Sequence, residues 1–369
     1  MSATPTEEKT RSVPKLSFTD AEAGALTFPS SDSRQYNYFT PEKAKATIYE
    51  DVTVDVIPDP DRYLTQDWVY AFANGEAGYP KDWTVLKSTD WHKFRDPNQE
   101  WEKTIYNNNS AIVRQIAQNM ENAKAQHAFA NWNVAWTNVV ARHVGAWMHV
   151  DQGLGMHVFV RANREAPNNM INNALAVNGV HKLRFAQDMA LYNLELSEEI
   201  KGFDGKAHLK AWKEDPVWQG VRENVERLTA IVDWGEQIFA ANVVFLPLVS
   251  ELFRSNFVMQ AAAPNGDYVT PSLMGVGEND DERDLRYTRV LYEMLTSDPQ
   301  YGEQNKKIMG EWLSKYVPMS LKAARALQPI WSQPQAKPVS FEESLTQSKE
   351  RFVSILNELH LASPKELNA

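Results

Sequence analysis

Hydrophobic residues recur at helical spacing through most of the chain, in long stretches that contain no proline. Prolines crowd the first sixty residues and then thin out, which leaves residues 98–166, 168–215 and 217–246 uninterrupted. Long helices are confined to such stretches because proline breaks a helix interior. Glycine is scarce, and the apolar–polar alternation typical of strands is almost confined to residues 51–57. The pattern predicts an all-α fold with core helices longer than the usual twelve or so residues.

Apolar residues that recur three and four positions apart predict where the individual helices lie. The first is expected to take its N-cap from residues 108–110, Asn-Asn-Ser. A polar break at residues 161–169, with Pro167 inside it, predicts the turn of an antiparallel helix pair, and residues 264–277 predict a loop. The expected helical segments are residues 111–120, 129–147, 170–196, 216–262 with a kink at Pro247, 280–297, 301–327 and 341–361.

These segments divide the chain into three parts. Residues 1–100 are an irregular arm, residues 101–330 a bundle of long helices, and residues 331–369 a linker followed by a C-terminal helix. The arm is rich in aromatic residues that cannot all be solvated, so it must lie on a surface, either that of the chain's own helices or that of a partner subunit. Those aromatic residues are Tyr36, Tyr38, Phe39, Tyr49, Tyr63, Trp68, Tyr70, Phe72, Trp83 and Trp91.

Composition excludes several classes of protein. The chain has no cysteine, which removes disulfides, thiolate metal sites and thiol nucleophiles. With 48 acidic against 38 basic residues, its net charge of −10 disfavours nucleic-acid binding. The longest apolar run, residues 238–249, contains Asn242 and Pro247 and is shorter than the roughly 18 to 20 residues of a membrane span. The polar start shows no signal peptide, so we expect a cytoplasmic protein with no membrane contact.

The sequence contains no complete set of catalytic or metal-binding residues that can be recognised as a motif. Two pairs of antiparallel helices predict a four-helix bundle, the scaffold on which di-iron proteins carry Glu-x-x-His motifs. No Glu or Asp in this chain is followed by His three residues later, and no nucleotide-binding loop or hydrolase elbow is present. His143, His149 and His157 have no carboxylate three or four residues away, and the histidines are interpreted as structural. The acidic run at residues 279–284 is interpreted as the first turn of a helix, where carboxylates complement the helix dipole.

Two segments carry a resemblance to a known family. Residues 38–53, YFTPEKAKATIYEDVT, and residues 94–97, FRDP, together with the long helices that follow, resemble the small (β) hydroxylase subunit of soluble bacterial multicomponent di-iron monooxygenases. The likeness runs over about residues 36–330 and is greatest to the propane monooxygenase group. It implies a ferritin-like fold shared with the catalytic α subunit, but without the irons.

The helix order of that family implies which residues stand in place of the iron ligands. These degenerate positions are Asp151, His181, Arg184, Asp284 and Tyr287, with either Ser250 or Glu251 at the remaining one. Because an isolated buried charge is costly, we expect Arg184 and Asp284 to pair across two helices. The alternative is that both point to solvent.

The resemblance also implies a function. This chain would be a non-catalytic subunit, inactive alone and without catalytic, cofactor-binding or metal-binding residues. It would support an α subunit, in an α2β2 assembly, whose di-iron centre hydroxylates a short alkane with O2. Electrons would come from NADH through a reductase, with a coupling protein. The alternatives are a β subunit of a tetrahydrofuran, phenol or toluene monooxygenase, a self-sufficient ferritin-like oxidase or metal store, and a helical scaffold unrelated to oxygenases.

Overall fold

The computed structural model describes residues 41, 43, 46–54 and 83–368. The chain divides into two units, Met1–Thr65 and Gln66–Ala369. The described part of the first unit is the short helix α2 (Ile48–Thr53), whose capping box joins Thr47 and Glu50: each accepts a hydrogen bond from the other's backbone N–H. Most of the predicted arm lies outside the described residues, so its docking on a surface stays a prediction.

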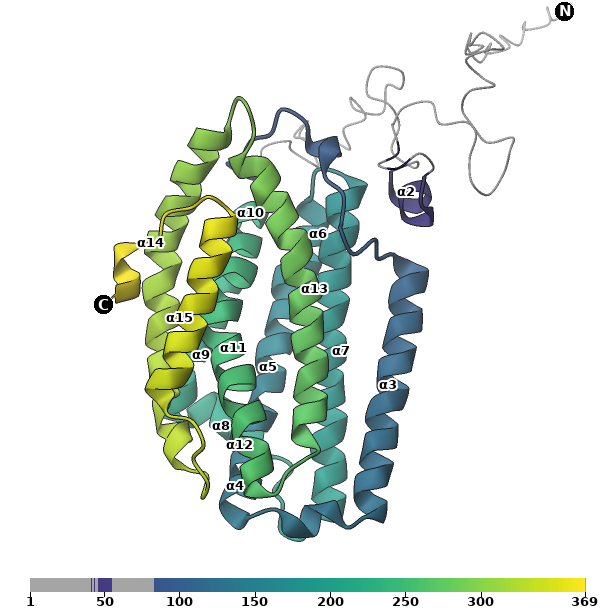
Figure 1. Ribbon diagram of the computed structural model, residues 1–369, viewed down its shortest axis with the longest axis vertical. Coiled ribbons are helices and arrows are strands. Elements are labelled where there is room, and N and C mark those ends of the chain that lie inside the picture. The colour runs from purple at the N-terminus through teal and green to yellow at the C-terminus, as the bar shows by residue number, and fades with distance from the viewer. Residues whose placement is uncertain (1–40, 42, 44–45, 55–82, 369) are drawn as a thin grey trace, which may run out of the picture. The chain divides into compact units, whose positions relative to one another are not determined.

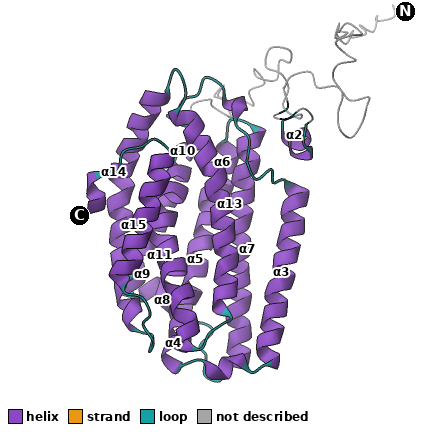
Figure 2. Ribbon diagram, viewed as in Figure 1, coloured by secondary structure: helices purple, strands orange, loops and turns teal. Residues whose placement is uncertain are grey.

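The second unit is a bundle of helices, and no strand occurs in its described residues 83–368 (Figures 1 and 2). The all-α prediction is confirmed. The helices are α3 (Glu102–Ala125), α4 (Val134–Val139), α5 (Gly145–Leu154), α6 (Val160–Glu165), α7 (Asn169–Glu199), α8 (Ala207–Glu214), α9 (Pro216–Thr229), α10 (Trp234–Ile238), α11 (Glu251–Phe253), α12 (Met259–Ala262), α13 (Thr270–Thr296), α14 (Gly302–Ala326) and α15 (Phe341–Glu358).

Wide π-helical turns join several of these helices end to end. The turns η4 (Val140–Val144) and η5 (Gly155–Phe159) connect α4, α5 and α6, while η6 (Phe239–Ser250) and η7 (Arg254–Val258) connect α10, α11 and α12. Pro247, which has no N–H to donate, is accommodated inside η6. The two composite helices, with α7 and α13, form the four core helices of the bundle (Figure 1).

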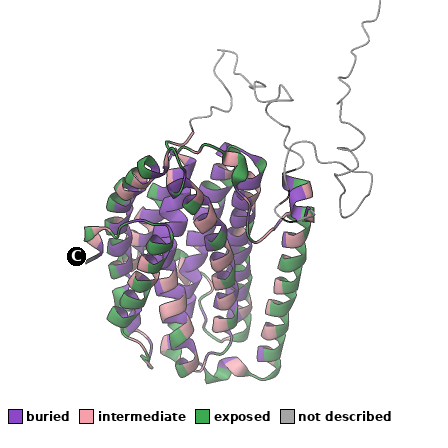
Figure 3. Ribbon diagram, turned by 45° about the horizontal axis from the view of Figure 1, so that its top comes forward, coloured by how far each residue is buried: buried purple, intermediate pink, exposed green. Residues whose placement is uncertain are grey.

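The core is dominated by aromatic side chains. Trp147 is fully buried and stacks on Phe245 and Phe253, with ring centroids 6.5 and 5.4 Å apart. Trp218 meets Phe253 edge to face at 5.3 Å. Figure 3 shows the buried residues concentrated on the inward faces of the helices. The stretch Trp234–Asn265 is long and apolar enough to cross a membrane, but 89% of its most apolar window is buried inside the bundle.

Several predicted helices are confirmed and others need correction. The segments 170–196, 301–327 and 341–361 are helical as predicted, in α7, α14 and α15.

Four predicted segments have the wrong boundaries. The expected helix 129–147 begins at Val134 and continues through η4, α5, η5 and α6 to Glu165. The first helix begins at Glu102, so residues 108–110 lie inside it. The expected helix 216–262 is interrupted between α9 and α10, where Asp233 caps a new start by accepting a hydrogen bond from Glu236 N at 3.1 Å. Helix α13 begins at Thr270, with Pro271 in its first turn, so the loop predicted at 264–277 is shorter.

The buried histidine His143 has two protein partners. Trp218 Nε1 donates to its Nδ1 at 3.0 Å, which leaves Nε2 to donate to Gln333 Oε1 at 3.0 Å. Burial, assisted by the nearby Arg142, lowers the pKa of His143 to about 4. The neutral imidazole is therefore the form that the fold requires, as expected for a structural histidine.

Acid is expected to destabilise the fold through His143. Its pKa is about 4 when folded and about 6.5 in an unfolded chain, so the unfolded state takes up the proton first and stability falls as pH drops from about 6.5 to 4. The full shift is worth about 3 kcal/mol. The variant His143→Gln, whose carbonyl can accept from Trp218, should flatten this part of the profile when thermal unfolding is compared at several pH values. An unchanged slope would contradict the assignment.

Candidate functional site

Five ionisable side chains meet at the centre of the four core helices. We call Asp151, Lys182, Arg254, Glu278 and Asp281 the central cluster; α5, α7, η7 and α13 supply them. The Lys182 ammonium bonds Asp281 and lies 3.6 Å from Asp151 Oδ1. The Arg254 guanidinium bonds Asp281 too, and its Nε is 2.9 Å from Glu278 Oε1. Two cations thus occupy the space between three carboxylates.

The local structure makes room for the Arg254 guanidinium. It lies over the rings of Trp147 and Phe185, 5.7 and 5.3 Å from their centroids. A Cβ added at Gly277 would come within 2.7 Å of both Arg254 Nη1 and Phe185, so only glycine leaves space at that point of α13. Arg254 is one of few charged residues in an otherwise apolar helix, and its side chain is fully buried.

Burial and ion pairing together set the charges of the cluster. Burial disfavours the charged form of Lys182, but Asp281 and Asp151 outweigh it and raise the lysine's pKa. Burial likewise opposes ionisation of Asp281, yet Arg254 and Lys182 hold the pKa of this carboxyl below its usual range. Asp151 differs: burial raises its pKa, although Lys182 and Arg254 oppose the rise. Asp281 is therefore the charged centre of the cluster, bridging both cations.

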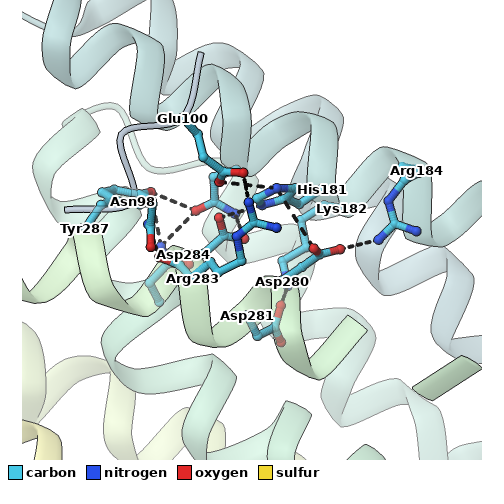
Figure 4. Close-up of polar contacts among 12 residues, drawn as sticks. Asn98, Glu100, His181, Lys182, Arg184, Asp280, Asp281, Arg283, Asp284 and Tyr287 are labelled. Atoms are coloured by element: carbon cyan, nitrogen blue, oxygen red, sulfur yellow. Dashed lines mark hydrogen bonds and ion pairs between the residues drawn. The ribbon is translucent and has the colours of Figure 1, made fainter. Parts of the chain in front are cut away.

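A second group of polar residues, the His181 network, lies beside the central cluster (Figure 4). His181 Nδ1 donates to Asp284 Oδ1 at 2.9 Å, and Asn178 Nδ2 donates to Asp284 Oδ2 at 2.7 Å. Tyr287 OH donates to Asn178 Oδ1 at 2.7 Å, and Asn242 Nδ2 donates to the same oxygen at 2.9 Å. Burial opposes the charge on His181, but the Asp284 and Asp280 carboxylates prevail and raise its pKa. The network ties α7 to α13 and η6.

The predicted pairing of Arg184 with Asp284 is wrong. Arg184 instead forms ion pairs with Asp188, one turn along α7, and with Asp280 of α13. Asp284 is held by His181, on the preceding turn of α7. Neither side chain points to solvent, so that alternative is also wrong: Asp284 is 1% exposed and Arg184 9%. Cross-helix pairing of buried charges does occur, but with the acidic partners displaced by one turn.

The remaining ligand-equivalent positions divide between the two groups. Asp151 lies in the central cluster, while Tyr287 lies in the His181 network. Of the two candidates Ser250 and Glu251, Ser250 faces the cluster, its Oγ 3.4 Å from Asp281 Oδ2. Glu251 faces α15, 3.6 Å from Arg351, and burial raises its pKa to about 8.

The interpretation of the acidic run is corrected by its place in α13. The helix begins nine residues before residue 279, so the run lies in its middle and not in its first turn. Three carboxylates of the run are buried, and each has a cationic partner. Asp280 pairs with Arg184, and Asp284 pairs with His181. Asp281 pairs with both Lys182 and Arg254. The run is therefore the acidic half of the core and does not serve as a helix cap.

Lys182, Arg254, Glu278 and Asp281 were not predicted as residues of the site. One signal pointed to Arg254: a guanidinium in a strongly apolar helix must be paired, since a lone buried charge is costly. Lys182 stands next to His181, and one residue along a helix turns the side chain by about 100°. Lys182 thus points to the centre of the bundle, whereas Arg184, two residues further on and about 200° around the helix, does not.

The central cluster does not fit a metal ion. An iron site on this scaffold needs several carboxylates and imidazoles with nothing cationic between them, whereas here an ammonium and a guanidinium occupy that space. In the described residues, no group of three or more His, Asp or Glu side chains is placed to hold a metal.

Comparison with known proteins identifies the family. The sequence profile of the methane/phenol/alkene hydroxylase family matches residues 68–299, more than half of the chain. The chain belongs to this family. Its fold agrees: phenol hydroxylase from a Pseudomonas species superposes with a TM-score of 0.72 at 16% identity, covering 89% of this chain and 99% of that one.

Two relatives within the methane/phenol/alkene hydroxylases indicate which kind of subunit the chain resembles. It is 56% identical to the propane 2-monooxygenase hydroxylase component small subunit of Mycolicibacterium smegmatis, over 99% of both chains. It is 26% identical to the methane monooxygenase component A beta chain of Methylococcus capsulatus, over 91% of this chain and 90% of that one. The predicted relation to hydroxylase small subunits, in the propane monooxygenase group, is confirmed.

Proposed function

We propose that this chain is the non-catalytic β subunit of a propane-type monooxygenase and that a larger α subunit carries the di-iron centre. The observation that supports this most strongly is the pair Lys182 and Arg254 at the centre of the bundle. These cations neutralise the buried carboxylates, a role that two metal ions would otherwise fill. The bundle can thus keep its shape without binding oxygen or transferring electrons.

The wider system follows from the same proposal. We infer an α2β2 hydroxylase in the cytoplasm, supplied with electrons from NADH by a reductase and regulated by a coupling protein. The name of the Mycolicibacterium relative, a hydroxylase component small subunit, supports a larger partner and further components. A propane-type substrate is favoured over phenol or toluene because identity is 54–56% to the propane relatives and 22–26% to the others.

Co-expression with the larger subunit of the same bacterium tests the proposal. We expect the two chains to co-purify with iron and, given reductase, coupling protein and NADH, to oxidise propane faster than tetrahydrofuran, phenol or toluene. This chain expressed alone should oxidise none of them. Propane oxidation or stoichiometric iron binding by the single chain would contradict the proposal, and a preference for phenol or toluene would reassign the substrate.

A further inference from the structure

The outward face of α7 is unusually apolar. Between residues 180 and 194, all of which the structure describes, the exposed residues are Val180, Gln187, Ala190, Leu191 and Leu194. Val180, Leu191 and Leu194 are 38%, 49% and 54% exposed. The solvent side of a surface helix is normally polar, yet no exposed charge occurs on this one for about four turns.

The neighbouring helix extends this apolar face. Met156 and Val160, on η5 and α6, are 44% and 43% exposed. The two helices approach closely through glycines: a Cβ at Gly155 would come within 2.8 Å of Leu183, and one at Gly179 within 3.1 Å of Val160. The exposed apolar residues of the two helices therefore lie close together. We call this surface the α7 face, and its residues are Met156, Val160, Val180, Leu183, Leu191 and Leu194.

The size of the α7 face matches that of an interface core. Fourteen residues of helix span about 21 Å, and two adjacent helices are about 20 Å wide, so the face projects about 400 Å². Stable interfaces bury about 800 Å² per partner, with an apolar centre and a polar rim. A patch of about 400 Å² falls within the size range of the largest apolar patch on a typical monomer, which is often functional.

We propose that the α7 face is the surface on which the larger hydroxylase subunit docks, through an uncharged apolar helical face of its own. This inference rests on the proposed function, which supplies such a partner. A second copy of the chain is the weaker occupant because each copy carries a net charge of −10 and two copies repel each other. A face without charges gives no electrostatic attraction to offset that repulsion.

Two substitutions on the face test the proposal, with a matched control elsewhere. In Val180→Arg and Leu191→Arg, a charge would be buried in the interface core, and we expect binding of the larger subunit to weaken at least 100-fold. Val232→Arg, at a position 72% exposed in the loop before α10, should bind like the wild type. Affinity is measured by biolayer interferometry and the mass of the complex by light scattering, while circular dichroism confirms that each full-length variant is folded.

The outcomes separate this inference from the proposed function. If the wild type binds the larger subunit and both arginine variants bind it equally well, the docking face is wrong while the proposed function stands. If the variants lose only self-association of the chain, the occupant is a second copy and the inference is overturned. If the co-expressed wild type does not bind the larger subunit at all, the proposed function fails, and the inference fails with it.

Discussion

Replacing Lys182 with methionine is expected to lower the free energy of unfolding by about 3–5 kcal/mol, the usual cost of removing one partner from a buried ion pair. Methionine fills much of the lysine's volume, so the loss comes mainly from charge. Without the ammonium, Asp281 keeps only Arg254 as a counter-ion, and Asp151 loses its nearest cation, 3.6 Å away. Urea unfolding of the full-length chain, followed by tryptophan fluorescence, measures the change.

Two further variants separate charge from packing. Lys315→Met removes a lysine that is 63% exposed and pairs with Glu236 on the surface, so it should cost less than about 1 kcal/mol. The double variant Lys182→Met, Asp281→Leu leaves Arg254 paired with Glu278 and should cost clearly less than the two single changes added together. Strict additivity would contradict a coupled buried pair.

Replacing Arg254 with methionine is expected to be at least as damaging, about 3–5 kcal/mol or more. Its guanidinium contacts both Asp281 and Glu278 and lies over two aromatic rings, so its removal leaves two carboxylates short of a cation and a gap beside Trp147. Arg254→Lys should restore only part of the loss, because one ammonium cannot reproduce the planar fork that reaches both carboxylates. The same urea titration measures both variants.

The matched control for Arg254 is Arg222→Met. Arg222 pairs with Glu226 on an exposed turn of α9, with side chains 37% and 62% exposed, so its removal should change stability by less than about 0.5 kcal/mol. An effect of Arg254→Met as small as that of Arg222→Met would show that the buried cations do not stabilise the bundle.

The helices were predictable where the local signal was strong. Residues 170–196, 301–327 and 341–361 carry regular apolar spacing, and α7, α14 and α15 follow it. The boundary near residue 230 was missed because no proline or glycine marks the interruption, which depends on the cap supplied by Asp233. The start of α13 was placed too late because Pro271, a favoured first-turn residue, was taken for part of a loop.

The sequence predicted that charged residues are buried and paired in the core, but it did not predict which residues pair. The sequence indicated buried charges on α5, α7 and α13 that must pair, and the structure has them paired. It could not give the partners, because a shift of one residue in a helix redirects a side chain by about 100°. Arg184 was therefore predicted at the centre of the bundle, where the structure has Lys182, two residues earlier and about 200° around the helix. The acidic run was predicted to be the first turn of a helix because carboxylates are common there. Its burial in the core depends on the other helices and could not be seen in the local sequence.

Under the function proposed above, the cluster explains how a bundle of this family keeps a stable core without a metal ion. A four-helix core shaped around carboxylates is unstable without cations, and this chain supplies them covalently through Lys182 and Arg254. The ion pairs also fix how the helices are aligned along their axes, because each cation reaches its carboxylate in only one alignment.

Anomalous diffraction at the iron absorption edge, recorded from crystals of the assembled hydroxylase, tests whether the two cations stand in place of iron. We expect no anomalous peak among Asp151, Lys182, Arg254 and Asp281, with the iron signal confined to the larger subunit. An iron peak at the centre of this bundle, with Lys182 or Arg254 displaced from Asp281, would contradict this expectation.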